Sequence, residues 1–310
     1  MHSLDVIIIG GGPSGMSAAL VAGRGLLKTV VVNAERPRNI VTTASHGFLS
    51  RDGVHPRELL AISKEQLKKY ETVRYIAGLV ARVAKAGEGF EVELKDGTQL
   101  RTKRLVVATG FTDVLSLLSL PGIEEVYGKS VYPCVFCDGF EHRGERLALF
   151  SKSGEDFYVP MVRHWSKDVA LFTNGTAVDS ERKRLLEGRG VLVVEEAVAK
   201  LVSIGGKLQA VELTSGDRVE RDAGFISDDY SKPSTPFAEQ LGVGKTQNGW
   251  GMEVLDVLPS GASTVDGLYV VGDARSGFGG LMASAAQGAA CMEGIVHEIA
   301  AQRWAEGANA

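Results

Sequence analysis

Two of the three cysteines in the chain, Cys134 and Cys137, are separated by only two residues, and Asp138 follows them directly. This spacing suits reversible thiol–disulfide chemistry, because a short loop or a first helical turn can bring the two sulfurs together and stabilise a thiolate. A neighbouring carboxyl group could exchange a proton with a thiol or with a leaving thiolate. The sequence therefore predicts a redox dithiol with Asp138 as its acid.

A zinc site is the alternative interpretation of the cysteine pair. A structural zinc ion needs four ligands, and with Cys291 as the one remaining cysteine a pattern of two cysteine pairs cannot be assembled. Cys291 lies in an apolar stretch and is expected in the core. Few cysteines, two of them in one motif, are typical of a reducing compartment, so we expect a cytoplasmic protein without a bound metal.

The composition indicates a globular protein of 310 residues, long enough for two domains. A formal net charge of -4 gives no electrostatic reason to expect nucleic acid or an anionic membrane as a partner. No apolar run reaches membrane-spanning length, and the first residues do not form a secretory signal.

The N-terminal segment predicts the elements of a dinucleotide site. Asp5–Ile9 is a continuous apolar run typical of a buried parallel strand, and it leads into a glycine-rich turn, an Ala-rich helix and a second such strand, Thr29–Asn33. In the turn, Gly10 permits a tight bend, Gly12 lets the backbone approach a pyrophosphate, and Gly15 lets the helix pack on the strand. The order of these elements predicts dinucleotide binding.

The end of the second strand departs from the usual pattern. An acid there normally binds the adenosine ribose, whereas this chain has Asn33, with Glu35 two residues later. Since an amide oxygen can accept one such bond, we expect Asn33 to be the contact, with Glu35 as the substitute. The irregular segment from residue 35 to 53 could reach over a cofactor or could be a surface connection.

Two further strands end in residues that suit a bound cofactor. Leu105–Gly110 is apolar and ends in glycine, and Gly267–Asp273 places Gly272 and a carboxylate at the edge of a parallel sheet. That carboxylate could hold a hydroxylated linker. The helix that begins near Gly279 contains Met282 and Ala283 in its first turn, where backbone amides could face a flavin ring or phosphate.

A second strand, helix and strand pattern follows the cysteine pair, with strands Arg146–Phe150 and Asp168–Phe172. The turn after the first of these strands, residues 151–156, has one glycine and two acids where a pyrophosphate would lie. The basic residues Arg182–Arg184 come late, on an expected solvated helix face. The pattern indicates that the fold is kept while the nucleotide site is degenerate.

Four motifs in this order resemble the low-molecular-weight thioredoxin reductase family over essentially the whole chain. They are the glycine turn at 10–15, Ala108-Thr109-Gly110, the Cys134–Gly139 motif and Gly272-Asp273. The resemblance implies an α/β fold with two Rossmann-like, three-layer domains. Residues 1–116 and 240–310 would form a discontinuous FAD domain, and residues 117–239 an inserted domain of the nicotinamide type that carries the cysteines. It also implies a homodimer.

The family's site residues carry over position by position. Cys137 would meet the flavin, Cys134 would exchange with the substrate sulfur, and Asp138 would be the acid. The expected FAD contacts are Gly10, Gly12, Pro13, Ser14, Gly15, Asn33, Gly110, Gly272, Asp273, Met282 and Ala283.

The departures from the family point to its branch without a nicotinamide site, because the second glycine fingerprint is missing and Leu281-Met282 replaces an Arg-Gln pair. That branch comprises gliotoxin-type dithiol oxidases and ferredoxin-dependent flavin thioredoxin reductases. The oxidases often have a histidine after the second cysteine, where this chain has Asp138, with His142 nearby.

The expected function is thus an FAD-dependent thiol–disulfide oxidoreductase for which NADPH is not a donor. Its substrate would be a small dithiol or disulfide or a thioredoxin-like protein, and its electron partner would be oxygen or ferredoxin. The alternatives are a conventional NADPH-dependent thioredoxin reductase and a flavin redox sensor without turnover.

Overall fold

The computed structural model describes residues 4–154, 157–247 and 253–307. The chain divides into two compact units. Unit 1 comprises Met1–Ile40, Gly47–Thr112 and Lys232–Ala310, and unit 2 comprises Val41–His46 and Asp113–Ser231. The sequence predicts the domain boundaries at residues 116 and 240, four and eight residues later than Thr112 and Lys232, and it does not separate the short segment 41–46. None of the helices in the described part of the chain combines the length and apolar content needed to cross a bilayer.

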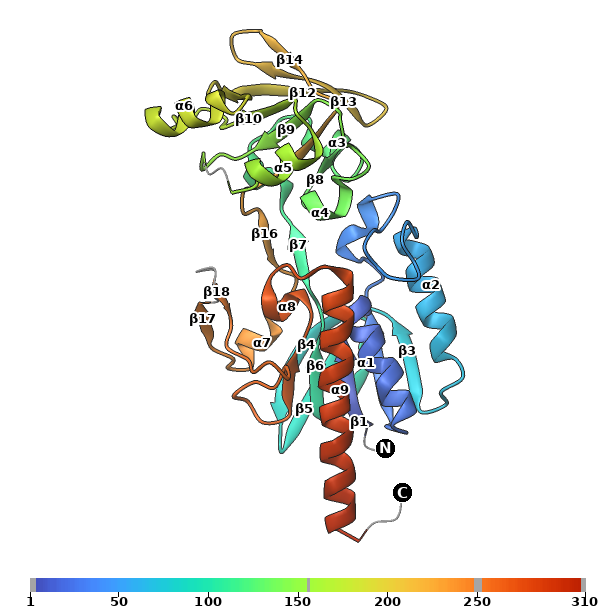
Figure 1. The fold of residues 1–310 in the computed structure, drawn as a ribbon. Helices are drawn as coiled ribbons and strands as arrows, with labels where there is room; N and C mark the ends of the chain where they lie inside the picture. Colours follow the sequence, from blue (N-terminus) through green and yellow to red (C-terminus); the bar gives the residue numbers. More distant parts are fainter. Residues whose placement is uncertain (1–3, 155–156, 248–252, 308–310) are drawn as a thin grey trace. The chain divides into compact units, whose positions relative to one another are not determined.

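Unit 1 is built on a seven-stranded sheet (Figure 1). Its strands are β1 (Leu4–Ile9), β2 (Thr29–Asn33), β3 (Val73–Ala77), β4 (Val80–Ala86), β5 (Gly89–Leu94), β6 (Gln99–Val107) and β19 (Leu268–Val270). They follow the order β3-β2-β1-β6-β5-β4, with β19 also on β6. Strands β3, β2, β1, β6 and β19 pair in parallel, whereas β4 and β5 are antiparallel additions. The parallel core confirms the expected Rossmann-like fold.

The sequence predicts a strand that begins at Leu105, but β6 already begins at Gln99 and runs as one strand to Val107. Its first half pairs with β5, up to Thr102, and its second half pairs with β19 from Leu105. The burial pattern alternates along the first half and is continuous along the second. The change from alternating to continuous apolar residues therefore indicates where the neighbour of β6 changes from β5 to β19. It does not indicate the end of a strand.

Helices α1 (Pro13–Arg24) and α9 (Gly280–Ala305) pack against each other in unit 1, as Figure 1 shows. Their close approach depends on Gly288, since a Cβ there would lie 1.9 Å from the carbonyl oxygen of Ser14. Cys291 follows one turn later and is buried in the core between these helices and the sheet, as the sequence predicted. Helix α2 (Pro56–Leu67) completes this layer.

The glycine turn has the tight geometry that its spacing predicts. Gly10 has a φ of +106°, and a Cβ there would lie 2.3 Å from the carbonyl oxygen of Ala108. A Cβ at Gly15 would lie 1.9 Å from the carbonyl oxygen of Gly10. Both positions therefore require glycine, and the turn delivers the chain directly into α1.

Unit 2 contains a five-stranded parallel sheet in the order β11-β10-β9-β15-β8. The strands are β8 (Val131–Tyr132), β9 (Leu147–Phe150), β10 (Val169–Phe172), β11 (Val191–Val194) and β15 (Ala223–Ile226). Helices α5 (Val159–Trp165) and α6 (Ser180–Gly188) follow β9 and β10. This is the second Rossmann-like unit that the sequence predicted. An antiparallel sheet of β12 (Val198–Ile204), β13 (Lys207–Leu213) and β14 (Arg218–Glu220) is added to it.

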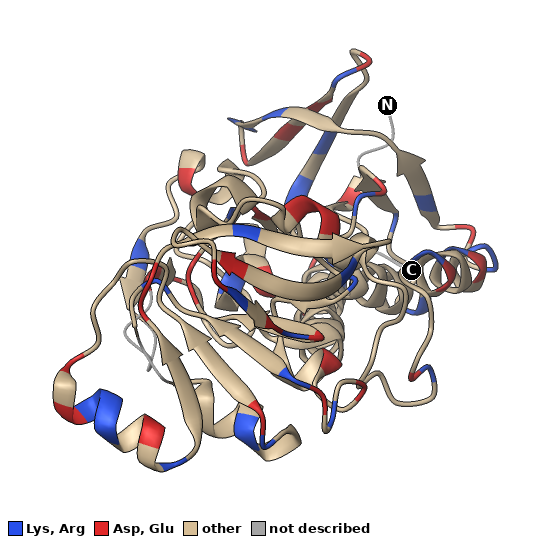
Figure 2. Ribbon diagram, turned by 90° about the horizontal axis from the view of Figure 1, so that it is seen from above, with Lys and Arg blue, Asp and Glu red and all other residues tan. Residues whose placement is uncertain are grey.

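The remaining elements are short. They are η1 (Arg38–Val41), β7 (Phe111–Asp113), η2 (Leu115–Leu118), α3 (Ile123–Val126), α4 (Val135–Asp138), β16 (Ser231–Pro233), α7 (Phe237–Gln240), β17 (Lys245–Gln247), β18 (Glu253–Leu255) and α8 (Asp273–Ser276). Basic and acidic residues are interspersed along the described ribbon of both units (Figure 2).

Candidate active site and cofactor site

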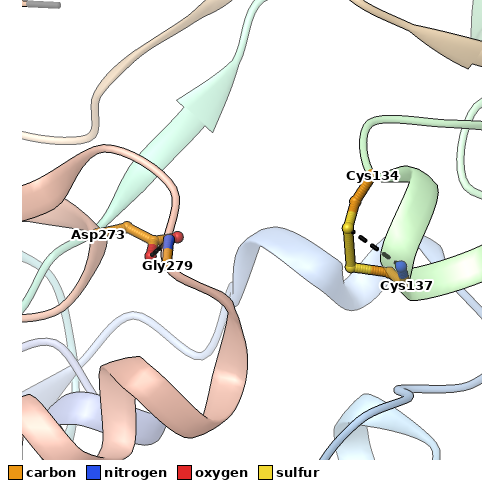
Figure 3. Close-up of a disulfide and its surroundings, with 4 residues drawn as sticks. All are labelled: Cys134, Cys137, Asp273 and Gly279. Atoms are coloured by element: carbon orange, nitrogen blue, oxygen red, sulfur yellow. Dashed lines mark hydrogen bonds between the residues drawn. A yellow bond between two sulfur atoms is a disulfide. The ribbon is translucent and has the colours of Figure 1, made fainter. Parts of the chain in front are cut away.

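Cys134 and Cys137 form a disulfide in unit 2 (Figure 3). Cys134 is the N-cap of α4, and its sulfur accepts a hydrogen bond of 3.1 Å from the backbone N–H of Cys137. When the bond is reduced, the same N–H would favour negative charge on the Cys134 sulfur, because hydrogen bonds to an ionised group are stronger than those to a neutral one. The short helix thus supplies both the geometry of the disulfide and part of the stabilisation of a thiolate.

The motif is held in place by close packing around Gly139. A Cβ at Gly139 would lie 2.4 Å from the carbonyl oxygen of Val135 and 2.8 Å from the indole ring of Trp165. Val135 is buried, whereas Phe136 is exposed and meets the Trp165 ring edge to face, with 6.0 Å between the ring centroids. The backbone of the motif is therefore fixed against α5 on one side.

Asp138 is a partly buried acid at the end of α4. Burial raises the pKa of its carboxyl group, the nearby His46 opposes the shift and Glu141 adds to it, and the net result is a pKa of about 7. His46 belongs to the segment 41–46 of unit 2, and its Nε2 lies 3.7 Å from a carboxylate oxygen of Glu141. A carboxyl group that titrates near neutrality can both take and give a proton.

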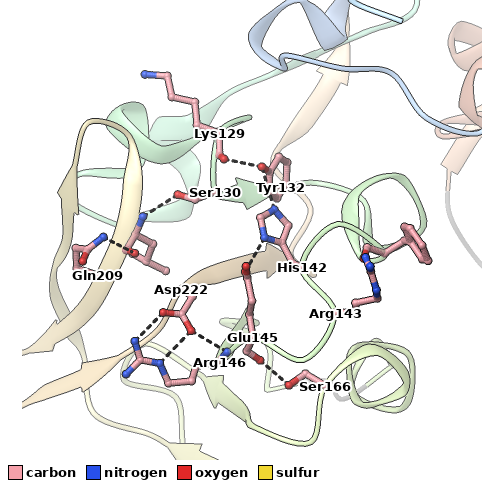
Figure 4. A network of polar contacts seen from close by, with 12 residues as sticks. Lys129, Ser130, Tyr132, His142, Arg143, Glu145, Arg146, Ser166, Gln209 and Asp222 are labelled. Atoms are coloured by element: carbon pink, nitrogen blue, oxygen red, sulfur yellow. Dashed lines mark hydrogen bonds and ion pairs between the residues drawn. The ribbon is translucent and has the colours of Figure 1, made fainter. Parts of the chain in front are cut away.

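His142 has a contact at each ring nitrogen (Figure 4). Nδ1 lies 2.7 Å from Oε2 of Glu145, and Nε2 lies 3.1 Å from the hydroxyl oxygen of Tyr132. The Tyr132 hydroxyl also donates to the carbonyl oxygen of Lys129. Both ring nitrogens of His142 are therefore engaged by neighbouring side chains of unit 2. This arrangement leaves Asp138 as the better candidate for the proton exchange.

The glycine turn of unit 1 has an unpaired buried hydroxyl at its end. Among the described residues, the Oγ of Ser14 is buried without a hydrogen-bond partner. Gly272 lies against it, since a Cβ there would be 2.9 Å from the Ser14 Cβ, and Gly272 has a φ of +70°. A buried polar atom without a partner is costly unless a ligand completes it. The feature fits a phosphate group at the start of α1.

Asn33 lies beside this turn, but its side chain is engaged with other residues of unit 1. Its Nδ2 donates to the hydroxyl of Tyr75 at 2.8 Å, and its Oδ1 accepts from the backbone N–H of Glu35. Glu35 accepts hydrogen bonds from Lys64 and Tyr75, and the bond from Lys64 holds the pKa of Glu35 below its usual value. A Cβ at Gly11 would lie 2.5 Å from the Asn33 side chain. The end of β2 therefore carries a hydrogen-bonded network in which Asn33 is one member, together with Glu35, Lys64 and Tyr75.

Asp273 follows β19 at the carboxyl edge of the same sheet. Its Oδ1 accepts a hydrogen bond from the backbone N–H of Gly279 at 3.0 Å (Figure 3). The same oxygen accepts a hydrogen bond from the Ser284 hydroxyl at 3.2 Å. The backbone N–H of Gly272 donates to Oε1 of Gln287. Ser284 and Gln287 were not predicted from the sequence, although their place in the first turns of α9 indicates that they face this edge.

The other predicted contact positions are found on the same unit. Gly110 has a φ of +64° directly before β7, and Met282 and Ala283 are exposed in the first turn of α9. A pocket of about 240 Å³ lies beside the glycine turn, where Gly11 and Gly12 face Phe48 and Arg51 of the irregular segment. Part of that segment therefore lines the pocket, whereas residues 41–46 belong to unit 2.

The strand ends of unit 2 differ from a nucleotide site. Asn174, after β10, donates from Nδ2 to the carbonyl oxygen of Ser119 and accepts from the backbone N–H of Val198. Lys183 of α6 is paired with Glu195 at the end of β11. The Asn174 side chain and the Lys183 ammonium group are therefore both bound to residues of unit 2 itself.

Known proteins resemble the chain over most of its length. The family model for pyridine nucleotide-disulphide oxidoreductases matches residues 4–152. The thioredoxin reductase tcpT of Claviceps purpurea is 30% identical over 286 residues, which cover 87% of this chain and 86% of that protein. The thioredoxin reductase aclD of Aspergillus oryzae is 26% identical and covers 96% of each.

Two solved structures share the fold over nearly the whole chain. A putative thioredoxin reductase, TrxB, of Bacillus anthracis has a TM-score of 0.90 and 31% identity, covering 97% of this chain and 99% of that one. The structure of HlmI has a TM-score of 0.89 and 31% identity, covering 98% of this chain and 95% of the other.

Proposed function

Since the chain belongs to the thioredoxin reductase-like flavoproteins of the pyridine nucleotide-disulphide oxidoreductase family, we propose that it oxidises a dithiol through Cys134 and Cys137 without taking electrons from NADPH. The observation that carries this proposal is the disulfide on α4, followed by an acid whose pKa burial raises to about 7. The pair can form the disulfide that a dithiol substrate would reduce.

Two thiol exchanges complete the reaction on the protein. A substrate thiolate attacks the Cys134 sulfur, a mixed disulfide forms, and Cys137 leaves as a thiolate. The second substrate thiol then attacks the substrate sulfur of the mixed disulfide, which releases a cyclic or linked substrate disulfide and the Cys134 thiolate. The substrate loses two electrons and two protons, and the cysteine pair gains the two electrons. Asp138 takes a proton from a substrate thiol or gives one to a leaving thiolate.

FAD is the cofactor that the family implies, and the residues of unit 1 fit it. The glycine turn and the unpaired Ser14 hydroxyl suit its pyrophosphate, the Asn33 and Glu35 network suits a ribose, and Asp273 suits a hydroxylated linker. When bound, FAD would supply a two-electron acceptor for the reduced cysteine pair. We assign the electron exchange with the flavin to Cys137 and the exchange with the substrate sulfur to Cys134.

The absence of a role for NADPH is supported by two features of unit 2. The turn after β9 has one glycine, Gly154, in place of the spaced glycines of a phosphate site. At the end of β10 the Asn174 side chain is used internally, and the described turn there, residues 173–176, has no basic side chain to meet a 2′-phosphate.

The partners follow from the same proposal. The reductant is a small dithiol, or a thioredoxin-like protein as the names of the relatives suggest, and the oxidant is oxygen. Reduced ferredoxin would be the electron donor if the electrons instead run from the flavin to a substrate disulfide. The protein would act as a homodimer in the cytoplasm. A conventional NADPH-dependent thioredoxin reductase is the second candidate, which the names of those relatives favour.

Steady-state turnover tests the proposal. The FAD-loaded protein should oxidise dithiothreitol when air is present as the electron acceptor, and Cys137→Ser should lower the rate by about a thousandfold or more, because a single thiol cannot close the cycle. NADPH-driven reduction of a protein disulfide at a comparable rate would favour the second candidate and overturn the proposal.

A further inference from the structure

The turn after β9 is closed by a carboxylate from a distant part of unit 2. The backbone N–H of Lys152 donates to Oδ2 of Asp228 at 2.8 Å, and the backbone N–H of Ser153 donates to Oδ1 at 3.3 Å. The two oxygens of one anion thus meet two consecutive amides. Backbone amides that converge in this way form the kind of site that binds phosphate oxygens in nucleotide-binding turns.

The strand order explains why Asp228 reaches this turn. Strands β9 and β15 are parallel neighbours, with Ile226 opposite Phe150, and the N–H of Ser227 donates to the carbonyl oxygen of Phe150 at 2.9 Å. Both strands therefore end at the same edge, and the second residue beyond β15 lies over the first residues beyond β9. Asp228 occupies the position from which a dinucleotide phosphate would approach.

The turn itself keeps the compact form of a phosphate-binding loop. Ser151 is completely buried, its hydroxyl lies 3.2 Å from that of Ser153, and the N–H of Gly154 donates to the Ser151 carbonyl oxygen. Gly154 has a φ of +69°. The loop is therefore ordered around the N–H groups of Lys152 and Ser153. The anion that these two groups bind is the Asp228 carboxylate of the same chain.

We propose that Asp228 is the residue that excludes nucleotides from unit 2: its carboxylate occupies the phosphate-binding amides of the turn, so that the unit carries a self-occupied anion site. A dinucleotide phosphate would have to displace the carboxylate and would then lie beside its negative charge. This inference rests on the proposed function, and it adds the Asp228 carboxylate to the missing glycines after β9 and the missing basic side chain after β10 as a cause of the loss of NADPH binding.

Removing the carboxylate should open the site to inorganic pyrophosphate and ADP. We expect titration calorimetry on the FAD-loaded protein to show affinity for either probe at least about tenfold tighter in Asp228→Gly than in the wild type, equal to about 1.4 kcal/mol. Asp228→Asn keeps the size and one acceptor oxygen but removes the charge, so its gain should be smaller. The matched control is Asp229→Asn, since Asp229 is the exposed neighbour and contacts the N–H of Ser231 instead. It should bind the probes as weakly as the wild type.

Hydrogen exchange provides a readout that does not depend on the probes. The amides of Lys152 and Ser153 should exchange slowly in the wild type and faster in Asp228→Gly, and pyrophosphate should restore their protection. Folded Gly and Asn variants that bind neither probe more tightly than the wild type would overturn the inference, as would unprotected amides in the wild type. If Asp228→Gly does not fold, the Asn variant decides the question through its affinity.

Failure of the inference and failure of the proposed function are distinguishable. The inference is contradicted if the Asp228 variants bind pyrophosphate and ADP no more tightly than the wild type. The proposed function is contradicted if the unmodified protein already binds NADPH and passes its electrons to the flavin. Turnover with dithiothreitol should stay within about twofold of the wild type in all three variants, because none of them touches the cysteine pair.

Discussion

The Nδ1 of His142 lies 2.7 Å from Oε2 of Glu145, and its Nε2 lies 3.1 Å from the hydroxyl oxygen of Tyr132. A histidine with both ring nitrogens engaged in this way orders the chain that follows the cysteine motif. The chain has Asp138 directly after Cys137, and the proton exchange of the thiol steps is assigned to that carboxyl group.

His142→Ala should therefore reduce stability more than activity. We expect the free energy of unfolding to fall by about 1–3 kcal/mol, because two hydrogen bonds are lost, one of them to a carboxylate. Dithiol turnover should stay within about threefold, with an unchanged pH profile, when measured well below the melting temperature. A loss of the pH dependence in this variant would make His142 the titrating group and would contradict the assignment.

Asp138→Asn should slow dithiol turnover by about a hundredfold, the usual contribution of a positioned acid or base. In the wild type, the limb of the rate profile that reports this group should have an apparent pKa near 7, since burial raises the pKa of Asp138 to about 7. That limb should be missing in the variant. A variant with a wild-type rate and profile would exclude Asp138 from the proton transfer.

The same shift has a consequence for stability. The pKa of Asp138 is higher in the folded than in the unfolded chain, so the folded protein holds this proton more tightly. The resulting stabilisation is complete below the unfolded value of about 4 and is lost as the pH rises through about 7. We expect Asp138→Asn to melt at a higher temperature than the wild type at pH 8, with a smaller difference at pH 5. An Asp138→Asn variant that melts at a lower temperature than the wild type at pH 8 would contradict the claim that burial destabilises the ionised carboxylate.

The parts of the molecule that the sequence predicts well are those determined by near neighbours. The run of β-branched residues before Gly10 predicts β1, and the spacing to Gly15 predicts the turn, because both depend on contacts within a few residues. The disulfide spacing is local in the same sense. The continuous β6 was missed because its pattern reports a change of neighbour at Leu105, and no local signal shows that the strand goes on.

The parts that could not be predicted depend on strand order. Tyr75 meets Asn33 through the pairing of β2 with β3, 42 residues apart, and Asp228 meets Lys152 across 76 residues through the pairing of β9 with β15. A sequence gives the types of these residues but not which strand ends are neighbours. The partners of Asn33 are therefore seen only in the structure. The same holds for the contact between Asp228 and the turn after β9.

Ser14→Ala should change the apoprotein and the FAD complex in opposite directions. The buried Ser14 hydroxyl has no partner among the described residues, so its removal should stabilise the apoprotein by up to about 1 kcal/mol, while FAD affinity should fall by about tenfold or more through loss of one bond to a phosphate. Thr72→Val is the matched control, since the Thr72 hydroxyl is likewise buried without a partner. It should stabilise the apoprotein and leave FAD affinity unchanged; equal FAD affinities in both variants would mean that Ser14 does not contact the cofactor.

Gly288→Ala should disrupt the packing of α1 on α9. The new Cβ would lie 1.9 Å from the Ser14 carbonyl oxygen, and we expect a loss of about 3 kcal/mol or more together with weaker FAD binding. Gly294→Ala in the same helix meets nothing within 4 Å and should gain about 0.5–1 kcal/mol from the better helix propensity of alanine. Chemical denaturation measures both, and similar effects for the two variants would contradict the close helix approach.

The central claim is that electrons enter through the cysteine pair and not from NADPH, and an anaerobic titration of the flavin absorbance tests it most directly. We expect dithiothreitol to bleach the flavin band of the FAD-loaded protein, NADPH to leave it nearly unchanged, and Cys137→Ser to prevent bleaching by the dithiol. Rapid and stoichiometric bleaching by NADPH, or full bleaching of the Cys137→Ser variant by the dithiol, would contradict the account.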